Sequence, residues 1–334
     1  MYFDLNDEEQ AIKDTAREFL ASRFPPAKVR ELAESRTYDE DLTKQIVDLG
    51  WTGIAIPEAH GGQGLGMVAL AALCEELGYA CAPSPFLGSV GAALLLTAGS
   101  EAQQGNWLPK LASGEAAGGF GDPTQLFCDV PGADVVIAFD DDGARVASGA
   151  EAGGELVETI DATRIYGRAA EASGEELGGD LVGARARLTV AIAAELTGVA
   201  QRAMEMAVSY ARERQQFDRQ IGAYQGVAHR CATMLQATEE ARSLTYYAAW
   251  TADAEPDSLP LGAAMAGSRA ADAAWEVATS ALQVFGGIGF TWEHDLQFWL
   301  KRARATGRML DTPGVHREHV AELCGLGAKV PAAV

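Results

Sequence analysis

Residues 210–225 read YARERQQFDRQIGAYQ, and this stretch interrupts a region, residues 181–327, that is otherwise patterned as long amphipathic helices. Alanine, leucine, methionine and arginine recur there at three- and four-residue spacing, as in helices with one apolar face. Two further interruptions divide the region at Asp253 to Pro260 and at Gly286 to Gly289. Several helices of this length predict a C-terminal four-helix bundle.

The segment before the bundle, residues 114–180, changes character to glycine, aspartate and short runs of β-forming residues. Residues 134–139, DVVIAF, and the DDDG that follows predict a strand and a turn. A segment of this length has room for only a few short strands. We therefore expect a small sheet that depends on its neighbours for stability.

The first part of the chain again has helical spacing, and Asn6 or Asp7 followed by Glu9 is typical of a capped helix start. The sequence therefore predicts a mainly α protein with a small β segment (α+β). Its parts are an N-terminal helical domain, a truncated middle β domain, a C-terminal bundle and a tail that we expect to fray: residues 1–113, 114–180, 181–327 and 328–334.

Composition excludes several classes of protein. The chain has 334 residues, 48% of them hydrophobic, and a formal net charge of -21, which argues against binding to nucleic-acid phosphates. It contains no apolar run long enough to span a bilayer, and its acidic N-terminus is unlike a secretory signal, so we expect a cytoplasmic protein. The five cysteines are scattered without zinc-ligand spacing, which predicts reduced thiols and no metal site.

Three stretches, in order along the chain, resemble signatures of the acyl-CoA dehydrogenase family. The first comprises residues 50–66, GWTGIAIPEAHGGQGLG, and residues 75–78, EELG; it is a marker of the fold. The second is residues 210–225, and the third is residues 283–291, QVFGGIGFT. Members of the family have the three-part architecture predicted above. They use FAD to remove hydrogen from the α and β carbons of an acyl-CoA thioester.

In the family, the second and third signatures contribute to the dinucleotide end of a FAD that is mainly held by a neighbouring subunit. Arg214 is the candidate for the pyrophosphate, because a guanidinium offers several donors in a rigid fork and keeps its charge. A pair of glycines leaves backbone amides free to donate, which suits Gly286 and Gly287. The other cofactor candidates are Gln216, Phe217, Gln225 and Gln283.

Each of these residues, taken singly, is better interpreted as a solvated side chain or a helix stop. Their joint order along the chain favours the cofactor interpretation for Arg214, Gln283 and Gly287. For Gln216, Phe217 and Gln225 the two interpretations are balanced.

The family's catalytic base is missing from the positions where the resemblance places it. Relatives carry a glutamate either late in the chain or early in the first bundle helix, and these positions fall at Leu310 and near Leu188. Leucine cannot accept a proton, so we predict no catalytic residue. Asp311 is a weak candidate, one residue out of register, that we interpret as a capping or solvated residue. Glu195 lies about two turns too far along its helix and is interpreted as a structural or interface acid.

The flavin-facing part of the middle domain matches the family only in part. Residues 119–126, GFGDPTQL, lead almost at once to the predicted strand, so we expect a loop and two strands of the family to be absent. The end of the domain, residues 161–164, DATR, resembles the family's ending. Asp218 and Gln220 stand where relatives have glycine and proline.

These departures lead to the hypothesis that this chain and a partner subunit each supply part of one active site. The chain resembles the short, catalytically incomplete subunit of heterotetrameric (α2β2) members of the family, notably those that degrade steroid side chains. We expect a full-length partner subunit to supply the base, to bind most of the acyl-CoA substrate and to share its FAD with this chain. Two alternatives stay open: a homo-oligomeric dehydrogenase with Asp311 as a displaced base, and a scaffold subunit that binds no flavin.

Overall fold

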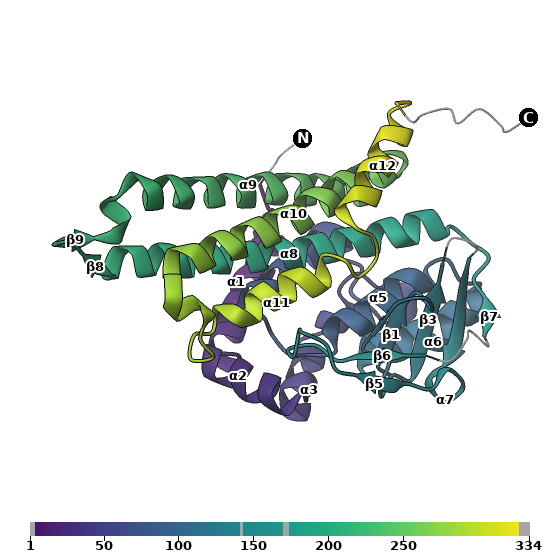
Figure 1. The fold of residues 1–334 in the computed structure, drawn as a ribbon. Helices are drawn as coiled ribbons and strands as arrows, with labels where there is room; N and C mark the ends of the chain where they lie inside the picture. The colour runs from purple at the N-terminus through teal and green to yellow at the C-terminus, as the bar shows by residue number, and fades with distance from the viewer. Residues whose placement is uncertain (1–3, 141–142, 170–173, 327–334) are drawn as a thin grey trace, which may run out of the picture.

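The computed structural model describes residues 4–140, 143–169 and 174–326; the predicted tail, 328–334, lies outside them. Figure 1 shows a helical N-terminal part, a sheet beside it and a bundle of long helices that extends away from the sheet. The mainly α fold with a small sheet is confirmed. The N-terminal helices are α1 (Asp7–Arg23), α2 (Pro26–Ser35), α3 (Glu40–Asp48), α4 (Gly66–Ala80), α5 (Phe86–Leu96) and α6 (Glu101–Ser113).

The predicted start of the first helix is confirmed. Asn6 is the N-cap of α1, and its side chain accepts hydrogen bonds from the backbone amides of Glu8 and Glu9. The carboxylate of Glu9 in turn accepts from the Asn6 amide at 2.8 Å. This reciprocal arrangement satisfies amides that have no partner within the helix.

The middle segment forms a mixed sheet in the order β5-β6-β2-β1-β3-β4-β7, which is more than the few strands predicted. Strands β1 and β3 pair in parallel, and the predicted strand is β3, with β4 as its antiparallel neighbour. Several of the others have two or three residues, too few to show an alternating pattern. The elements are β1 (Gly118–Gly121), β2 (Phe127–Cys128), β3 (Val135–Phe139), β4 (Ala144–Ser148), α7 (Gly149–Ala152), β5 (Glu155–Val157), β6 (Tyr166–Arg168) and β7 (Glu175–Glu176).

Helix α5 links the sheet to the helices. Its sequence, FLGSVGAALLL, has no charged residue, and every residue of it is buried. One side lies against β1, where the Phe120 ring is so close that a Cβ on Gly91 would meet it at 2.2 Å. A helix that is apolar on all sides belongs to a core. The short strands are therefore stabilised by packing on this helix, as expected.

Three long helices and two shorter ones form the C-terminal bundle (Figure 1). Helices α8, α9 and α10 pack against one another, α11 packs on α8 and α10, and α12 packs on α10. They are α8 (Leu181–Glu213), α9 (Gln225–Ala254), α10 (Leu259–Phe285), α11 (Leu296–Thr306) and α12 (Pro313–Leu323). In the part of the chain that the structure describes, no helix is both long and apolar enough to cross a membrane.

The EELG signature holds the N-terminal helices on the bundle. Helices α4 and α8 cross with their backbones in contact. A Cβ on Gly78 would lie 2.0 Å from the Glu195 carbonyl oxygen, and one on Gly198 would lie 1.8 Å from that of Glu75. The buried Glu75 carboxylate also binds Arg242 of α9 at 3.1 Å. This signature is therefore structural, because its side chains and glycine fix one helix on two others.

A buried cluster of charges joins the end of the middle segment to the bundle. Arg302 donates to the Asp161 carboxylate (2.9 Å), to Glu195 (2.8 Å) and to the Thr163 carbonyl (2.8 Å). Arg164 donates to both carboxylate oxygens of Glu195 at 2.8 Å. We call these five residues the buried junction. Burial alone raises the pKa of Glu195, but Arg164 and Arg302 outweigh burial and hold that pKa below its usual value. Glu195 is thus a structural acid, as predicted.

Candidate functional site

The second signature forms an exposed hairpin between α8 and α9. Strands β8 (Gln215–Gln216) and β9 (Arg219–Gln220) pair so that Phe217 and Asp218 make a two-residue turn. Both turn residues have positive φ, 53° and 62°. Such turns usually contain glycine or asparagine, because most other residues are strained at positive φ. The turn directs Phe217 away from the bundle, and this residue is 87% exposed.

Local contacts hold the hairpin where it joins α8 and along one of its faces. The Ile221 amide donates to the Arg214 carbonyl at 2.8 Å, and the Tyr224 hydroxyl donates to the Gln216 carbonyl at 3.1 Å. The guanidinium of Arg219 lies over the Tyr224 ring, 3.9 Å from its centroid. Arg214 is exposed, and none of the described carboxylates lies within ion-pair distance of it. The hairpin therefore presents Arg214 outward without a charged partner of its own.

The third signature forms the turn that ends α10. Gly286 caps the helix with a φ of 64°, and the 3₁₀ turn Gly286–Phe290 follows. A Cβ on Gly286 or Gly287 would meet no atom within 4 Å, so the backbone is open on that side. Gln283 is exposed in the last turn of the helix, and Phe290 is 73% exposed. Open backbone beside a polar side chain suits a ligand that approaches main-chain amides closely.

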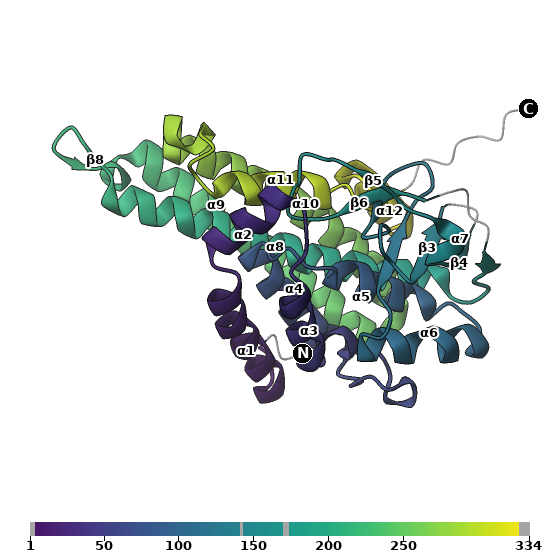
Figure 2. The ribbon, with the colours of Figure 1, turned by 90° about the horizontal axis from the view of Figure 1, so that it is seen from below.

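The two signatures lie at the same end of the bundle. The Tyr210 ring near the end of α8 packs on the Phe285 ring at the end of α10, with centroids 4.7 Å apart. Figures 1 and 2 show the hairpin and the end of α10 together, far from the sheet. All of the predicted cofactor residues are exposed there. We call this surface the bundle end, and it comprises Arg214, Gln216, Phe217, Gln225, Gln283, Gly286 and Gly287.

The bundle end offers binding groups and little acid–base chemistry. Arg214 places positive charge on a chain of net charge -21, and a guanidinium binds phosphate with several hydrogen bonds. The exposed rings of Phe217 and Phe290 are apolar surfaces that a planar base would cover. Arginine, glutamine and backbone amides donate hydrogen bonds without exchanging protons near neutral pH. The surface is therefore suited to holding a cofactor.

The region where the family's base is expected is closed. Leu188 is completely buried and Leu310 is 8% exposed. A cavity beside Leu310 has a volume of about 10 Å³, room for one water molecule. Asp311 lies on this cavity, with a carboxylate oxygen 3.8 Å from Arg185. The capping interpretation of Asp311 is wrong, because the N-cap of α12 is Thr312.

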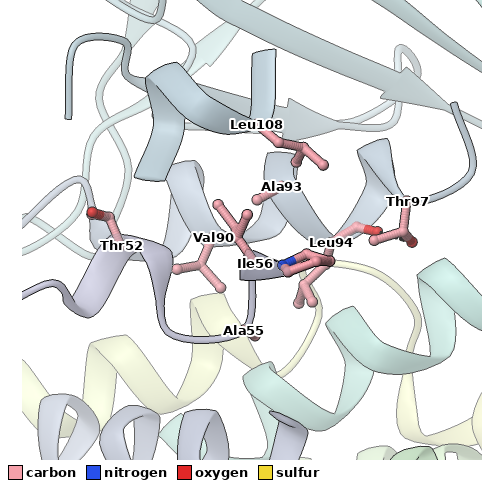
Figure 3. A pocket seen from close by; sticks show the side chains of 9 residues that line it. Thr52, Ala55, Ile56, Val90, Ala93, Leu94, Thr97 and Leu108 are labelled. Atoms are coloured by element: carbon pink, nitrogen blue, oxygen red, sulfur yellow. Dashed lines mark hydrogen bonds between the residues drawn. The ribbon is translucent and has the colours of Figure 1, made fainter. Parts of the chain in front are cut away.

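Two other cavities lie away from the bundle end. One, of about 10 Å³, lies among α5, α6 and the turn that follows α3 (Figure 3), and its lining is apolar except for two threonines. The hydroxyl of Thr52 already donates to the Ala112 carbonyl at 3.1 Å. The other, of about 240 Å³, lies among α1, α4, α8 and α11, with Arg17, Tyr79, Arg202 and Trp299 in its walls. Neither lining contains a predicted site residue.

Comparison with known proteins matches both helical parts. Residues 6–115 match the acyl-CoA dehydrogenase N-terminal domain, and residues 184–324 match the acyl-CoA dehydrogenase C-terminal domain. The acyl-CoA dehydrogenase IpdE2 of Mycobacterium tuberculosis is 33% identical over 311 residues, which cover 92% of this chain and 94% of the relative. The solved structure of the ChsE4-ChsE5 complex from Mycobacterium tuberculosis contains a similar chain. The TM-score is 0.84 at 25% identity, and the match covers 99% of this chain and 100% of that chain.

Another relative differs in length. The probable acyl-CoA dehydrogenase YngJ of Bacillus subtilis is 25% identical over 366 residues, which cover 91% of this chain and 94% of the relative. This alignment is longer than the 334 residues of this chain, so YngJ carries residues that have no counterpart here. The alignment with IpdE2 spans 311 residues, which is shorter than this chain, so it does not require additional residues of that kind in IpdE2.

Proposed function

The chain belongs to the acyl-CoA dehydrogenase family, and we propose that it is the short subunit of a heterotetramer, in which it completes the FAD site of a full-length partner. Enzymes of this family are FAD-dependent oxidoreductases that introduce a double bond between the α and β carbons of an acyl-CoA. FAD, when bound, supplies the acceptor for the hydride that leaves the β-carbon. The residues of this chain serve binding and orientation.

The bundle end holds the dinucleotide portion of the partner's FAD in this proposal. Arg214 binds the pyrophosphate, and the Gly287 amide donates to the same region. The Gly286 amide already donates to the Leu282 carbonyl at the end of α10, so Gly286 contributes only open backbone. Polar contacts come from Gln216, Gln225 and Gln283, and Phe217 supplies an apolar surface. The fit is supported by the open backbone over the two glycines, where an added Cβ meets no atom within 4 Å.

One observation carries the proposal: all predicted cofactor residues gather on an exposed end of the bundle, whereas the predicted base positions are filled by the buried Leu188 and Leu310. A small-molecule site normally encloses most of its ligand, so an open surface of this kind needs a second chain to complete it. The partner must also supply the base and the donors that polarise the thioester carbonyl.

The partner is proposed to be a full-length member of the same family. The likeness to a chain of the ChsE4-ChsE5 complex supports this, because that structure is described as a complex of two proteins. The residues that YngJ has and this chain lacks agree with the proposed loss of part of the middle domain. We propose a bulky acyl-CoA, with a steroid side chain as the candidate acyl group, held mainly by the partner.

The test is to express the chain alone and together with a full-length family member from the same organism, and to measure native mass and flavin absorbance. We expect a colourless or poorly soluble chain alone, and a yellow α2β2 complex with one FAD for every two chains. A yellow homotetramer formed by this chain alone would overturn the proposal. A colourless α2β2 complex would instead favour the flavin-free scaffold. Turnover of steroid and short-chain acyl-CoA by the yellow complex then tests the acyl group.

A further inference from the structure

A group of metal-ligand side chains stands beside the closed cavity, on the side of the bundle that carries α12. Asp311, His316 and His319 each offer one ligand atom, and these three atoms all lie within 4.8 Å of one another. We propose that the three residues bind one divalent first-row transition-metal ion, for which Zn²⁺ is the appropriate probe. The expectation of no metal rested on the spacing of the cysteines, and the spacing Asp-x4-His-x2-His contains none. The proposed site therefore departs from that expectation.

The separation of the ligand atoms is close to what a metal ion requires. Among three atoms no more than 4.8 Å apart, some point lies within about 2.8 Å of all three. Zinc binds imidazole nitrogen and carboxylate oxygen at about 2.0–2.2 Å, so inward shifts of roughly 0.7 Å per atom complete the coordination. Rotations about side-chain bonds provide shifts of this size without moving the backbone.

The fold brings the three residues together for simple reasons. His316 and His319 are three residues apart on α12 (Pro313–Leu323), so their side chains share one face. Asp311 immediately precedes Thr312, the N-cap of that helix. His316 is buried against α10, where a Cβ on Gly267 would lie 2.8 Å from the imidazole Nε2, so the glycine makes room for the ring. His319 is exposed and leaves a path for an ion from solvent.

The three side chains have one competing contact among the described residues, the ion pair of Asp311 with Arg185. Among the described residues, no hydrogen bond holds either imidazole or the Asp311 carboxylate. The nearest guanidinium, Arg185, is 3.8 Å from Asp311, beyond hydrogen-bond distance. Arg185 also has other partners, since it donates to the Asp140 carbonyl at 3.2 Å and lies over the Phe139 ring, so a metal ion could replace it at Asp311. A chain of net charge -21 also attracts cations to its surface.

Two histidines and one carboxylate form a ligand set that zinc uses in proteins, with further positions left for water. The ion would tie α12 to the loop after α11, next to the cavity that Leu310 and Asp311 line. In this role Asp311 is a ligand, which removes it as a displaced catalytic base. The site is independent of the bundle end, because its three residues belong to a different part of the bundle.

The test is zinc binding by chelator-treated protein, measured as the chain alone and in its complex with the partner. A chromophoric chelator serves as the competitor, and the metal content is counted after gel filtration. We expect one zinc per chain and a rise in melting temperature on zinc addition. Asp311→Asn and His319→Gln should weaken binding at least about tenfold and abolish the rise in melting temperature. Both positions are at least partly exposed, so both variants are expected to fold.

Two control variants locate the binding. His229→Gln changes an exposed histidine of α9, and Cys324→Ser changes the exposed cysteine that follows α12; both should bind zinc as the wild type does. The proposal fails if Asp311→Asn and His319→Gln bind zinc normally, if Cys324→Ser loses the metal, or if the wild type binds none. Flavin content of the complex is measured in parallel. It should not change in any of these variants, so failure here is distinguishable from failure of the shared FAD site.

Discussion

The buried junction and the bundle end each depend on an arginine, but one arginine is paired within the chain and the other is not. Arg302 in the buried junction has a side chain 2% exposed, and it binds Asp161, Glu195 and Thr163. Arg214 at the bundle end is exposed, and no described carboxylate pairs with it. A buried guanidinium needs its partners within the chain, because an unpaired buried charge is strongly destabilising. An exposed guanidinium can take its partner from another molecule.

The glycines of the molecule show the same contrast. An added Cβ on Gly198 would lie 1.8 Å from a carbonyl oxygen of the crossing helix, whereas one on Gly287 would meet no atom within 4 Å. The first glycine is required by packing. The second is not, so its backbone is available to a ligand. Residue type and motif therefore do not assign a role until burial and partners are known.

The largest expected effect comes from breaking the buried junction. Glu195→Gln leaves Arg164 and Arg302 without their shared carboxylate, and removing one member of a buried ion pair costs about 3–5 kcal/mol of folding free energy. Denaturant unfolding of purified protein measures it. Glu213→Gln, at the exposed end of the same helix, is the matched control and should change the midpoint little. Equal effects of the two substitutions would contradict the assignment of Glu195 to a buried structural role.

Alanine at two glycines should separate packing from binding. Gly198→Ala forces the α4–α8 crossing apart and should destabilise the protein by about 1–3 kcal/mol. Gly287→Ala should leave stability within about 0.5 kcal/mol of the wild type but lower the FAD content of the complex. Thermal unfolding and flavin absorbance of the same samples check both. Loss of stability without loss of flavin in Gly287→Ala would show that the turn is only a helix stop.

The folding stability that Glu195 contributes to the buried junction should depend on pH. The two arginines hold the pKa of Glu195 below its ordinary value of 4.5 in the folded protein. The stabilisation is therefore complete above the unfolded-state pKa and is lost as the pH falls through the lower, folded-state pKa. Denaturant midpoints measured from pH 7 down to about pH 3 should fall less steeply below pH 4.5 in Glu195→Gln than in the wild type. Parallel curves for the two proteins would mean that Glu195 is not preferentially ionised in the folded state.

The smallest effect is expected at Asp311. Asp311→Asn should change turnover of the yellow complex by no more than about twofold, because in our proposal the partner supplies the base. The homo-oligomeric alternative predicts that turnover is abolished. Steady-state kinetics with the same acyl-CoA distinguishes the two, with Asp272→Asn on α10 as a control of equal charge change.

Local signals were sufficient for much of the fold. The cap at Asn6, the strand β3 and the breaks between the bundle helices all follow from side-chain chemistry or periodicity that acts over a few residues. The extent of the sheet was underestimated, because strands such as β2 and β7 are held by backbone pairing across the sequence and carry no pattern of their own.

Some charged residues were likewise interpreted correctly from the sequence, and others were not. Glu195 was interpreted correctly as a structural acid, because its position two turns beyond the expected base removed it as a catalytic candidate. Arg302 was missed as its partner, since it lies in a run of basic residues, KRAR, that is equally typical of a solvated helix. Only the fold brings residues 161–164 against α11 and α8. For Arg214 the family resemblance suggested the role, and the fold supplied its exposure.

The most direct test of the central claim is the flavin content of the co-expressed complex when Arg214 is changed. Arg214→Gln should keep the native mass and the thermal stability of the α2β2 complex but lose most of its FAD, and added FAD should rebind more weakly. Arg23→Gln, which changes an exposed arginine at the end of α1, should retain FAD at the wild-type level. A fully yellow complex with Arg214→Gln would contradict the claim that the bundle end of this chain completes the partner's cofactor site.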